Sequence, residues 1–328
     1  MTEYRLCTYA EAGDRSALRR AMAKLNRLSF SHYDGVIVPT PMFVEWFASR
    51  PGMDPRLCQA AFAGDELVSS VLVTLAKMRL AGRMVLCGIL DEVMTHPDHR
   101  RRGLARALIQ RALVAMGARG AEVSLLNTLE ATPPSGPQQL YESSGYQVYE
   151  RVDRFEVTWG RPEAPAVASK IPPDGAARAA VESALGERDG WLELNDELWR
   201  WRRAERALDS PGALYRAAGG GFGAWCGADL TFAGHPKSCT VLSDIVLPPG
   251  DHASEDLAEL VAVSSRGLSV TVLCPRSDPI LGRLLRQQGF AVVGTELAML
   301  RPFSDDIARH IQRGPDCWYV AVESIIGV

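Results

Sequence analysis

The second half of the sequence repeats the order of elements that the first half predicts. Asp91–Asn127 and Ser243–Cys274 each indicate a strand, a turn containing proline, a helix, an Arg-Gly pair and another strand. Residues 136–157 and 279–300 then each indicate a short helix, a glycine and a further strand. A match over this length is a repeat of a folding unit rather than of a short motif. The chain is therefore predicted to contain two related domains.

Each unit is predicted to be a sheet with helices packed against it. In the first unit, Asp14 can cap a helix at 15–28, and Pro41 begins a second, short helix. Gly64-Asp65 is a hairpin turn, and strands are predicted at 3–10, 56–63, 66–77, 78–89 and 90–95. A helix pair, an antiparallel meander, a crossover helix and then strand, helix and strand give an α+β fold with a sheet of mixed direction.

The length of the chain agrees with two domains. It has 328 residues, of which 47% are hydrophobic, which is enough for about two cores. The segment after residue 160 is rich in Pro, Ala and Gly, so we expect a first domain at 1–160, a linker at 161–185 and a second domain at 186–328. A helical stretch is predicted at 191–208, and its tryptophans are expected in the core.

The composition excludes several classes of protein. A net charge of −3 argues against a nucleic-acid-binding protein, which is normally basic. No apolar run approaches the roughly 20 residues of a membrane span, and the first residues lack the pattern of a signal peptide. The seven cysteines form no Cys-x-x-Cys pair, so neither disulfides nor a metal site are expected. These features favour a cytoplasmic protein that binds no nucleic acid, membrane or metal.

Four arginines crowd the predicted start of the helix that follows the strand at 90–95. Helix starts expose unpaired N–H groups and the positive end of the dipole, so acidic residues are favoured there. The first turn instead holds Arg100, Arg101, Arg102 and Arg106. A solvated basic helix start is the simple alternative. The complete strand, turn and helix context favours an external anion such as phosphate, and the small residues Gly103 and Ala105 would let it approach the backbone.

These residues resemble the acyl-CoA-binding signature of the GNAT superfamily of N-acyltransferases. Arg100, Gly103 and Ala105 fill the fixed positions of (Arg/Gln)-x-x-Gly-x-(Gly/Ala), and the strand end at 93–95 followed by His-Pro is also similar. The resemblance implies a GNAT fold over 1–160, loop amides that hold the pyrophosphate of acetyl-CoA, and a strand that pairs with the pantetheine arm. The implied cofactor-binding residues are Val93, Met94, Thr95, Arg100, Arg101, Arg102, Gly103, Leu104, Ala105, Arg106 and Asn127.

Acyl transfer to an amine requires a route for the proton of the amine and a donor for the leaving thiolate. The segment 141–146 resembles the family's Tyr-x-x-x-Gly-(Phe/Tyr), which implies that Tyr141 protonates the sulfur. For the base we favour Glu92, with Asp91, Glu130 or a bound water as alternatives. Strand alternation predicts that at most one of Asp91 and Glu92 points into the cleft. No Ser/His/Asp or Cys/His nucleophile pattern stands out, which favours direct attack in a ternary complex.

The second unit is expected to have lost the acyl-CoA site. In the loop that corresponds to the arginine turn it has acidic residues, Asp251, Glu255 and Asp256, which repel phosphate. Leu285 stands at the position of Tyr141. The glycine run at 219–223 precedes a strand rather than a helix, so it is predicted to be a hairpin turn and not a phosphate loop.

The sequence thus predicts an acetyl-CoA-dependent N-acetyltransferase of two GNAT-like domains, the second of them degenerate. Its acceptor is expected to be a small-molecule amine, and the protein to be a monomer or homodimer. One alternative is a non-catalytic acyl-CoA-binding or regulatory protein, because Pro134 stands where the family often has Asn. Another is transfer of a longer acyl group, since the sequence does not give the size of the pocket around Met94 and Leu126.

Overall fold

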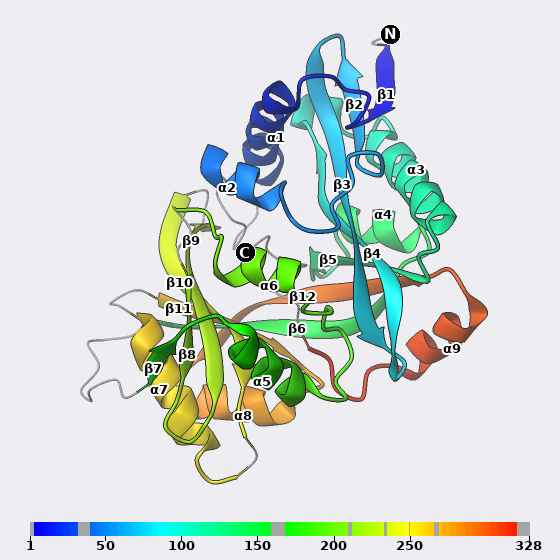
Figure 1. Cartoon of the computed structure of the whole chain (residues 1–328). Coiled ribbons are helices and arrows are strands. Elements are labelled where there is room, and N and C mark those ends of the chain that lie inside the picture. Colours follow the sequence, from blue (N-terminus) through cyan, green and yellow to red (C-terminus); the bar gives the residue numbers. More distant parts are fainter. Residues whose placement is uncertain are drawn as a thin grey trace.

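A single mixed sheet runs through both halves of the chain (Figure 1). The computed structural model describes residues 3–31, 40–158, 168–208, 212–232, 235–248, 250–265 and 269–319. The order of the strands across the sheet is β1 (Tyr4–Thr8), β2 (Gln59–Ala63), β3 (Glu66–Leu80), β4 (Arg83–Thr95), β5 (Val123–Leu129), β12 (Ala291–Pro302), β6 (Gln147–Thr158), β11 (Ser269–Pro275), β10 (His235–Val246), β9 (Phe222–Phe232), β8 (Gly212–Arg216) and β7 (Ser169–Ile171).

The strand order agrees with the predicted duplication and adds an exchange of strands. Read inward from either edge, the sheet has five strands in sequence order, and the fourth and fifth of each set are parallel to each other. At the centre, however, β12 pairs with β5 of the first half, and β6 pairs with β11 of the second half. The last strand of each half therefore lies in the part of the sheet that the other half builds. The two exchanged strands pair antiparallel with each other.

The helices follow the same duplication. They are α1 (Arg15–Phe30), α2 (Pro41–Phe47), α3 (Leu104–Ala118), α4 (Gly136–Glu142), α5 (Gly175–Leu185), α6 (Asp196–Arg203), α7 (Ala253–Ser265), α8 (Pro279–Gln287) and α9 (Asp305–Arg313). Asp14 and Thr40 cap α1 and α2 by accepting backbone N–H groups, as their side chains favour. In the first half, α1 and α2 lie on one side of the sheet and α3 and α4 on the other (Figure 1).

A stacked pair of tryptophans joins α2 of the first half to α6 of the second. The Trp46 and Trp201 rings are 4.4 Å apart and tilted by only 4°. The Nε1 of each indole donates to the backbone oxygen of the other residue, at 3.2 and 3.0 Å. Buried indoles need such partners. The main hydrophobic core includes both rings together with residues of β4, β5 and β12, so it extends across the two halves.

Three expectations on local structure require correction. The strands predicted at 78–89 and 90–95 are instead the end of β3 and one long β4, because only the turn at 81–82 interrupts them. The described part of the expected linker 161–185 contains β7 and α5, whose apolar Ala177, Val181 and Leu185 recur at helical spacing. The helix expected at 191–208 is limited to α6, because Asn195 caps it within the stretch. Trp199 and Trp201 are buried, as predicted.

Candidate functional site

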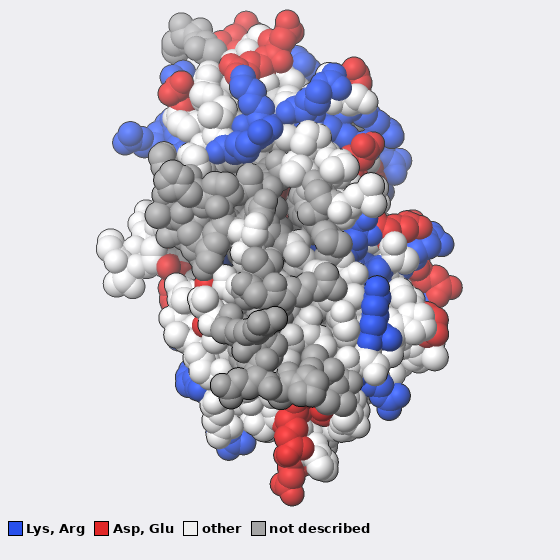
Figure 2. Space-filling model, turned by 90° about the vertical axis from the view of Figure 1, so that its left-hand side faces the viewer, with Lys and Arg blue, Asp and Glu red and all other residues white. Residues whose placement is uncertain are grey.

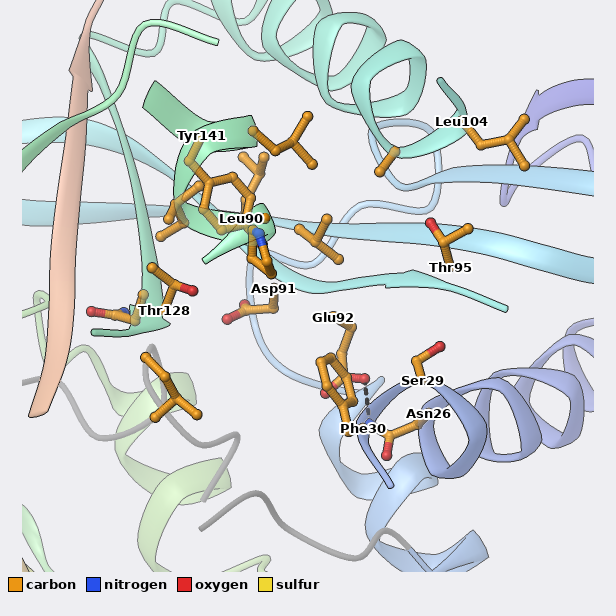
Figure 3. Close-up of a pocket in the computed structure, with 18 of the residues that line it drawn as sticks. Asn26, Ser29, Phe30, Leu90, Asp91, Glu92, Thr95, Leu104, Thr128 and Tyr141 are labelled. Carbon is orange, nitrogen blue, oxygen red and sulfur yellow. Dashed lines mark hydrogen bonds between the residues drawn. The ribbon is translucent and has the colours of Figure 1, made fainter. Parts of the chain in front are cut away.

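The main cavity opens where β4 and β5 separate. Their parallel pairing extends only from Cys87 to Ile89 on β4, so Leu90–Thr95 and the end of β5 do not pair with each other. The unpaired edges and the helices α1 to α4 enclose a cavity of about 550 Å³ (Figure 3). An open strand edge offers backbone N–H and C=O groups to an extended ligand. The cavity is therefore suited to a ligand that lies along β4.

A β-bulge turns two successive carboxylates into this cavity. The pairing of β3 with β4 shifts between Ser70, opposite Met94, and Leu72, opposite Asp91. Glu92 within the bulge has a φ of +49°. The bulge breaks the alternation of side chains, so Asp91 and Glu92 both line the cavity (Figure 3). The prediction that at most one of them would do so is wrong.

The two carboxylates have different partners. Asp91 forms an ion pair with the buried guanidinium of Arg50, which also donates to Thr74. Burial raises the pKa of Asp91, and Arg50 opposes that shift. Glu92 accepts a hydrogen bond of 2.6 Å from the amide of Asn26, and no cation is paired with it among the described residues. Burial raises the pKa of Glu92 to about 7, a value suited to a general base at neutral pH.

The opposite end of the cavity is the positively charged tip of α3. Gly103, the N-cap, has a φ of +79° and supplies no side chain, and a Cβ placed there would meet nothing within 4 Å. Arg100 donates to the backbone oxygens of Ser29 and Thr95. Within the described parts of the chain, no carboxylate pairs with Arg100, Arg101, Arg102 or Arg106. The tip therefore keeps its N–H groups and its positive charge for an anion.

Further basic residues lie on α1, beside the cavity. The helix has no acidic residue, and its basic residues are Arg15, Arg19, Arg20, Lys24 and Arg27. Figure 2 shows Lys and Arg side chains gathered on the upper part of the molecule, where Figure 1 places α1. Arg19 pairs with Glu45 and Lys24 with Glu66, so the positive charge that would attract a polyanionic ligand here comes from the other three basic residues of the helix.

The comparisons with known proteins agree with this geometry. Residues 16–149 match the family model described as "Acetyltransferase (GNAT) domain". This part of the chain is a GNAT domain. The acyltransferase family is thereby identified for residues 16–149, the part of the chain that holds the α3 tip and the open edge of β4. No curated protein has a significant match to the sequence.

Solved structures with this fold cover nearly the whole chain. A GCN5-related N-acetyltransferase from Anabaena variabilis is 17% identical, with a TM-score of 0.62 over 93% of this chain and 74% of that one. Eis1 from Mycobacterium abscessus is 18% identical, with a TM-score of 0.56 over 92% and 73%. N-myristoyltransferase from Saccharomyces cerevisiae with bound myristoyl-CoA is 12% identical, with a TM-score of 0.69 over 98% and 85%. At these identities the likeness is one of fold.

Most residues predicted for the GNAT site line the cavity. They are Glu92, Val93, Thr95, Arg100, Arg101, Gly103, Leu104, Ala105, Arg106, Asn127 and Tyr141. Met94 and Arg102 do not: the Met94 side chain is buried outside the cavity, and Arg102 donates to the hydroxyl of Tyr4 and the backbone oxygen of Asp98. The alternative base Glu130 pairs with Arg151, also outside the cavity. Tyr141, on α4, is buried with its ring edge-on to that of Tyr146.

Several cavity residues were not predicted from the sequence. They are Asn26 from α1, the aromatic residues Phe30, Phe43 and Phe47, and the charged residues Arg154 and Glu296 from β6 and β12. The amphipathic pattern of α1 and α2 gave no sign that part of their apolar face lines a cavity. Glu296, a residue of the second half, reaches the GNAT site only through the exchange of strands, for which the sequence carries no local signal, and Arg154 of β6 pairs with it there.

The equivalent place in the second half is closed by its own side chains. Asp244 lies in a matching bulge with a φ of +50°, but it pairs with Arg202 and Arg203 and accepts a hydrogen bond from Tyr319. The cavity beside it has a volume of only about 30 Å³. In the predicted hairpin turn at 219–223, backbone N–H groups donate to the buried carboxylate of Asp256 at 2.8 and 2.7 Å. A side chain of α7 thus already satisfies the N–H groups of this turn.

None of the helices in the described ranges is long and apolar enough to cross a membrane. The same ranges contain no group of three or more His, Cys, Asp or Glu residues placed to hold a metal ion.

Proposed function

We propose that the chain is an acetyl-CoA-dependent N-acetyltransferase that acts on a small-molecule amine by direct attack in a ternary complex. The observation that carries the proposal is one cavity with three parts: a basic helix tip, an open strand edge, and a polar end that contains Glu92 with its pKa of about 7. The first two suit the diphosphate and the extended arm of coenzyme A. The third suits an amine that must lose a proton.

The proposed reaction needs only side chains of the first half. Glu92 takes a proton from the ammonium group of the acceptor, and the neutral amine attacks the thioester carbon. Backbone N–H groups at the open edge of β4 face the region where the oxyanion forms. When the tetrahedral intermediate collapses, the C–S bond breaks and the thiolate takes a proton from the Tyr141 hydroxyl. The attacking nitrogen loses its second proton, which restores that hydroxyl. The products are the N-acetylated amine and free coenzyme A.

Calorimetric titration of acetyl-CoA into the full chain tests the cofactor site. We expect binding, and we expect Gly103→Glu to abolish it, because a carboxylate at the helix tip repels the diphosphate. Gly120→Glu is the matched control: Gly120 also has a positive φ and open space, but lies beyond the other end of α3. No binding by the wild type, or equal binding by Gly103→Glu, would remove the proposal.

A panel of amines with detection of the released thiol tests the reaction itself. Tyr141→Phe should lower kcat by about 10²-fold and leave the dissociation constant of acetyl-CoA unchanged. A protein that only binds acyl-CoA would show affinity without release of the thiol.

A longer acyl group is the second candidate, since the fold is shared with an N-myristoyltransferase that binds myristoyl-CoA. Competition between acetyl-CoA and a series of longer acyl-CoA esters distinguishes the two. If kcat/KM increases with the length of the acyl chain, the longer acyl-CoA, and not acetyl-CoA, is the preferred donor.

A further inference from the structure

The exchange of strands brings a charged pair to the GNAT cavity from the middle of the sheet. Arg154 on β6 and Glu296 on β12 both line the cavity, and the Nη2 of Arg154 donates to the Oε1 of Glu296 at 2.7 Å. The two side chains are only 5% and 4% exposed. Glu296 lies opposite Leu129 of β5, the strand that forms one edge of the opening. The second half of the chain therefore supplies a carboxylate to the site of the first.

The sheet itself does not require this carboxylate. Glu296 lies opposite Val152, and each of the two stands seven residues after the glycine that precedes its strand, Gly289 or Gly145. The two residues therefore hold equivalent positions in the two halves. Because one of these positions is a valine, the sheet does not need a charged side chain there. A buried ion pair gains little net stability, because the loss of hydration offsets the attraction. Burial raises the pKa of Glu296 despite Arg154, in agreement with that cost.

The charges at this end of the cavity favour a cation. Among the described residues, Asp91 pairs with Arg50 and Glu296 with Arg154, whereas Glu92 has only the neutral amide of Asn26. These described side chains set two cations against three carboxylates. Of the two Glu296 oxygens, Oε1 accepts the bond from Arg154, and Glu296 forms no other hydrogen bond within the described residues. A second donor can therefore bind Glu296 without displacing Arg154.

The strand spacing gives a lower limit for the length of a suitable acceptor. Glu92 and Glu296 lie on strands separated by β5, and β4 has already separated from β5 at Glu92, so the two residues are at least two strand steps, about 10 Å, apart. An amine that reacts beside Glu92 therefore needs a spacer of several methylene groups to place a second ammonium at Glu296. Phe30, Phe43 and Phe47 provide an apolar wall for such a spacer.

We propose that Glu296 is a specificity-determining residue that binds a second ammonium group of the acceptor, so that the preferred substrate class is a diamine or a larger amine with that spacing. This inference rests on the proposed acetyltransferase function. It assigns the acceptor end of the site to a residue of the second half.

Three probes with the same chain of five carbon atoms test the assignment at saturating acetyl-CoA: 1,5-diaminopentane, 1-aminopentane and 5-aminopentanoate. We expect the diamine to have the highest kcat/KM. Glu296→Gln should lower kcat/KM for the diamine by about 10- to 100-fold, as for a lost hydrogen bond to a charged group, and should lower that of the monoamine much less. The KM of acetyl-CoA should not change.

Two further variants separate recognition from stability. Asp153 lies on the same strand as Arg154 but outside the cavity, and it forms an ion pair with Arg276. Asp153→Asn removes this carboxylate and should leave the ratio of kcat/KM for the diamine to kcat/KM for the monoamine unchanged. Arg154→Met/Glu296→Leu removes both charges together, so that neither is left buried without a partner. It should fold and lose the preference for the diamine.

The results also distinguish this inference from the proposed function. Preference for 5-aminopentanoate would show that Arg154 selects a carboxylate, and would overturn the inference, as would a diamine preference that survives Glu296→Gln. If acetyl-CoA binds but no probe is acetylated, calorimetric titration of 1,5-diaminopentane into the complex with coenzyme A measures binding at the same site without turnover. Binding that Glu296→Gln weakens supports the inference, and absence of binding overturns it. Failure to bind acetyl-CoA is instead a failure of the proposed function.

Discussion

Glu92 shows how a single backbone irregularity determines what a residue can do. In a regular strand its side chain and that of Asp91 would point to opposite faces of the sheet. The bulge, with its φ of +49°, turns both into the cavity, where Asp91 pairs with Arg50, and where Glu92 has Asn26 as its one hydrogen-bond partner among the described residues. The sequence identified the carboxylate but not its orientation. A bulge depends on the pairing with β3, which local residue patterns do not reveal.

If Glu92 is the general base, Glu92→Gln should lower kcat/KM by about 10²- to 10⁴-fold. In the wild type, kcat/KM should rise as the pH passes about 7, because Glu92 must be deprotonated to accept the proton. The variant should lose this rise. A pH profile of both proteins with the same amine measures it, and an unchanged profile in the variant would assign the proton to bound water.

The same substitution should have the opposite effect on stability. The pKa of Glu92 in the folded state, about 7, lies above the ordinary value of 4.5, so its contribution to stability is present below pH 4.5 and is lost as the pH rises through 7. At pH 8, Glu92→Gln should therefore raise the free energy of unfolding, by up to about 3 kcal/mol. Thermal unfolding of the wild type and of Glu92→Gln at pH 4.5 and pH 8 tests this. If the variant gains the same stability at both pH values, the titration of Glu92 is excluded as the cause.

At the scale of elements, the tip of α3 is the part of the site that the sequence predicted best. A strand, a turn and a helix start are local features, and the arginine turn with Gly103 carries its own physical signal. Eleven of the thirteen predicted residues line the cavity, because they belong to segments that are continuous in sequence. Arg50 and Glu296 were missed, since only tertiary and strand contacts bring them to the site.

Neighbouring arginines of the α3 tip should differ in their effect on the cofactor. Arg101 lines the cavity and forms no hydrogen bond or ion pair within the described chain, whereas Arg102 is turned towards Tyr4. Arg101→Ala should raise the dissociation constant of acetyl-CoA about tenfold. Arg102→Ala, the matched control, should change it much less. Calorimetry at low and high salt measures both, and equal losses would show that only net charge matters.

At the scale of the whole molecule, the two halves are joined in one sheet rather than built as two separate sheets. They share the central strands, the hydrophobic core and the stacked tryptophans. The duplication could be predicted from the sequence, because each copy keeps its own order of elements. The strand exchange could not be predicted, since the residue pattern of each copy is the same whether its last strand pairs within its own half or with the other half.

A chain limited to residues 1–160 should therefore not behave as a folded monomer. It lacks β12, so one edge of β5 is left without a partner, and β6 loses both of its neighbours. We expect aggregation, or a dimer in which β6 of each copy takes the place of β12 in the other. Sedimentation of the fragment measures this. A monomer that binds acetyl-CoA as well as the full chain would contradict it.

The position of β12 also has a consequence for synthesis of the protein. A ribosome makes the GNAT half first, yet the strand that borders β5 is Ala291–Pro302, which begins 162 residues after Leu129, the last residue of β5. Until that strand emerges, the nascent GNAT half has an open sheet edge, a target for chaperones. A premature stop codon anywhere before it would leave the cofactor signature intact and the sheet beside it unfinished.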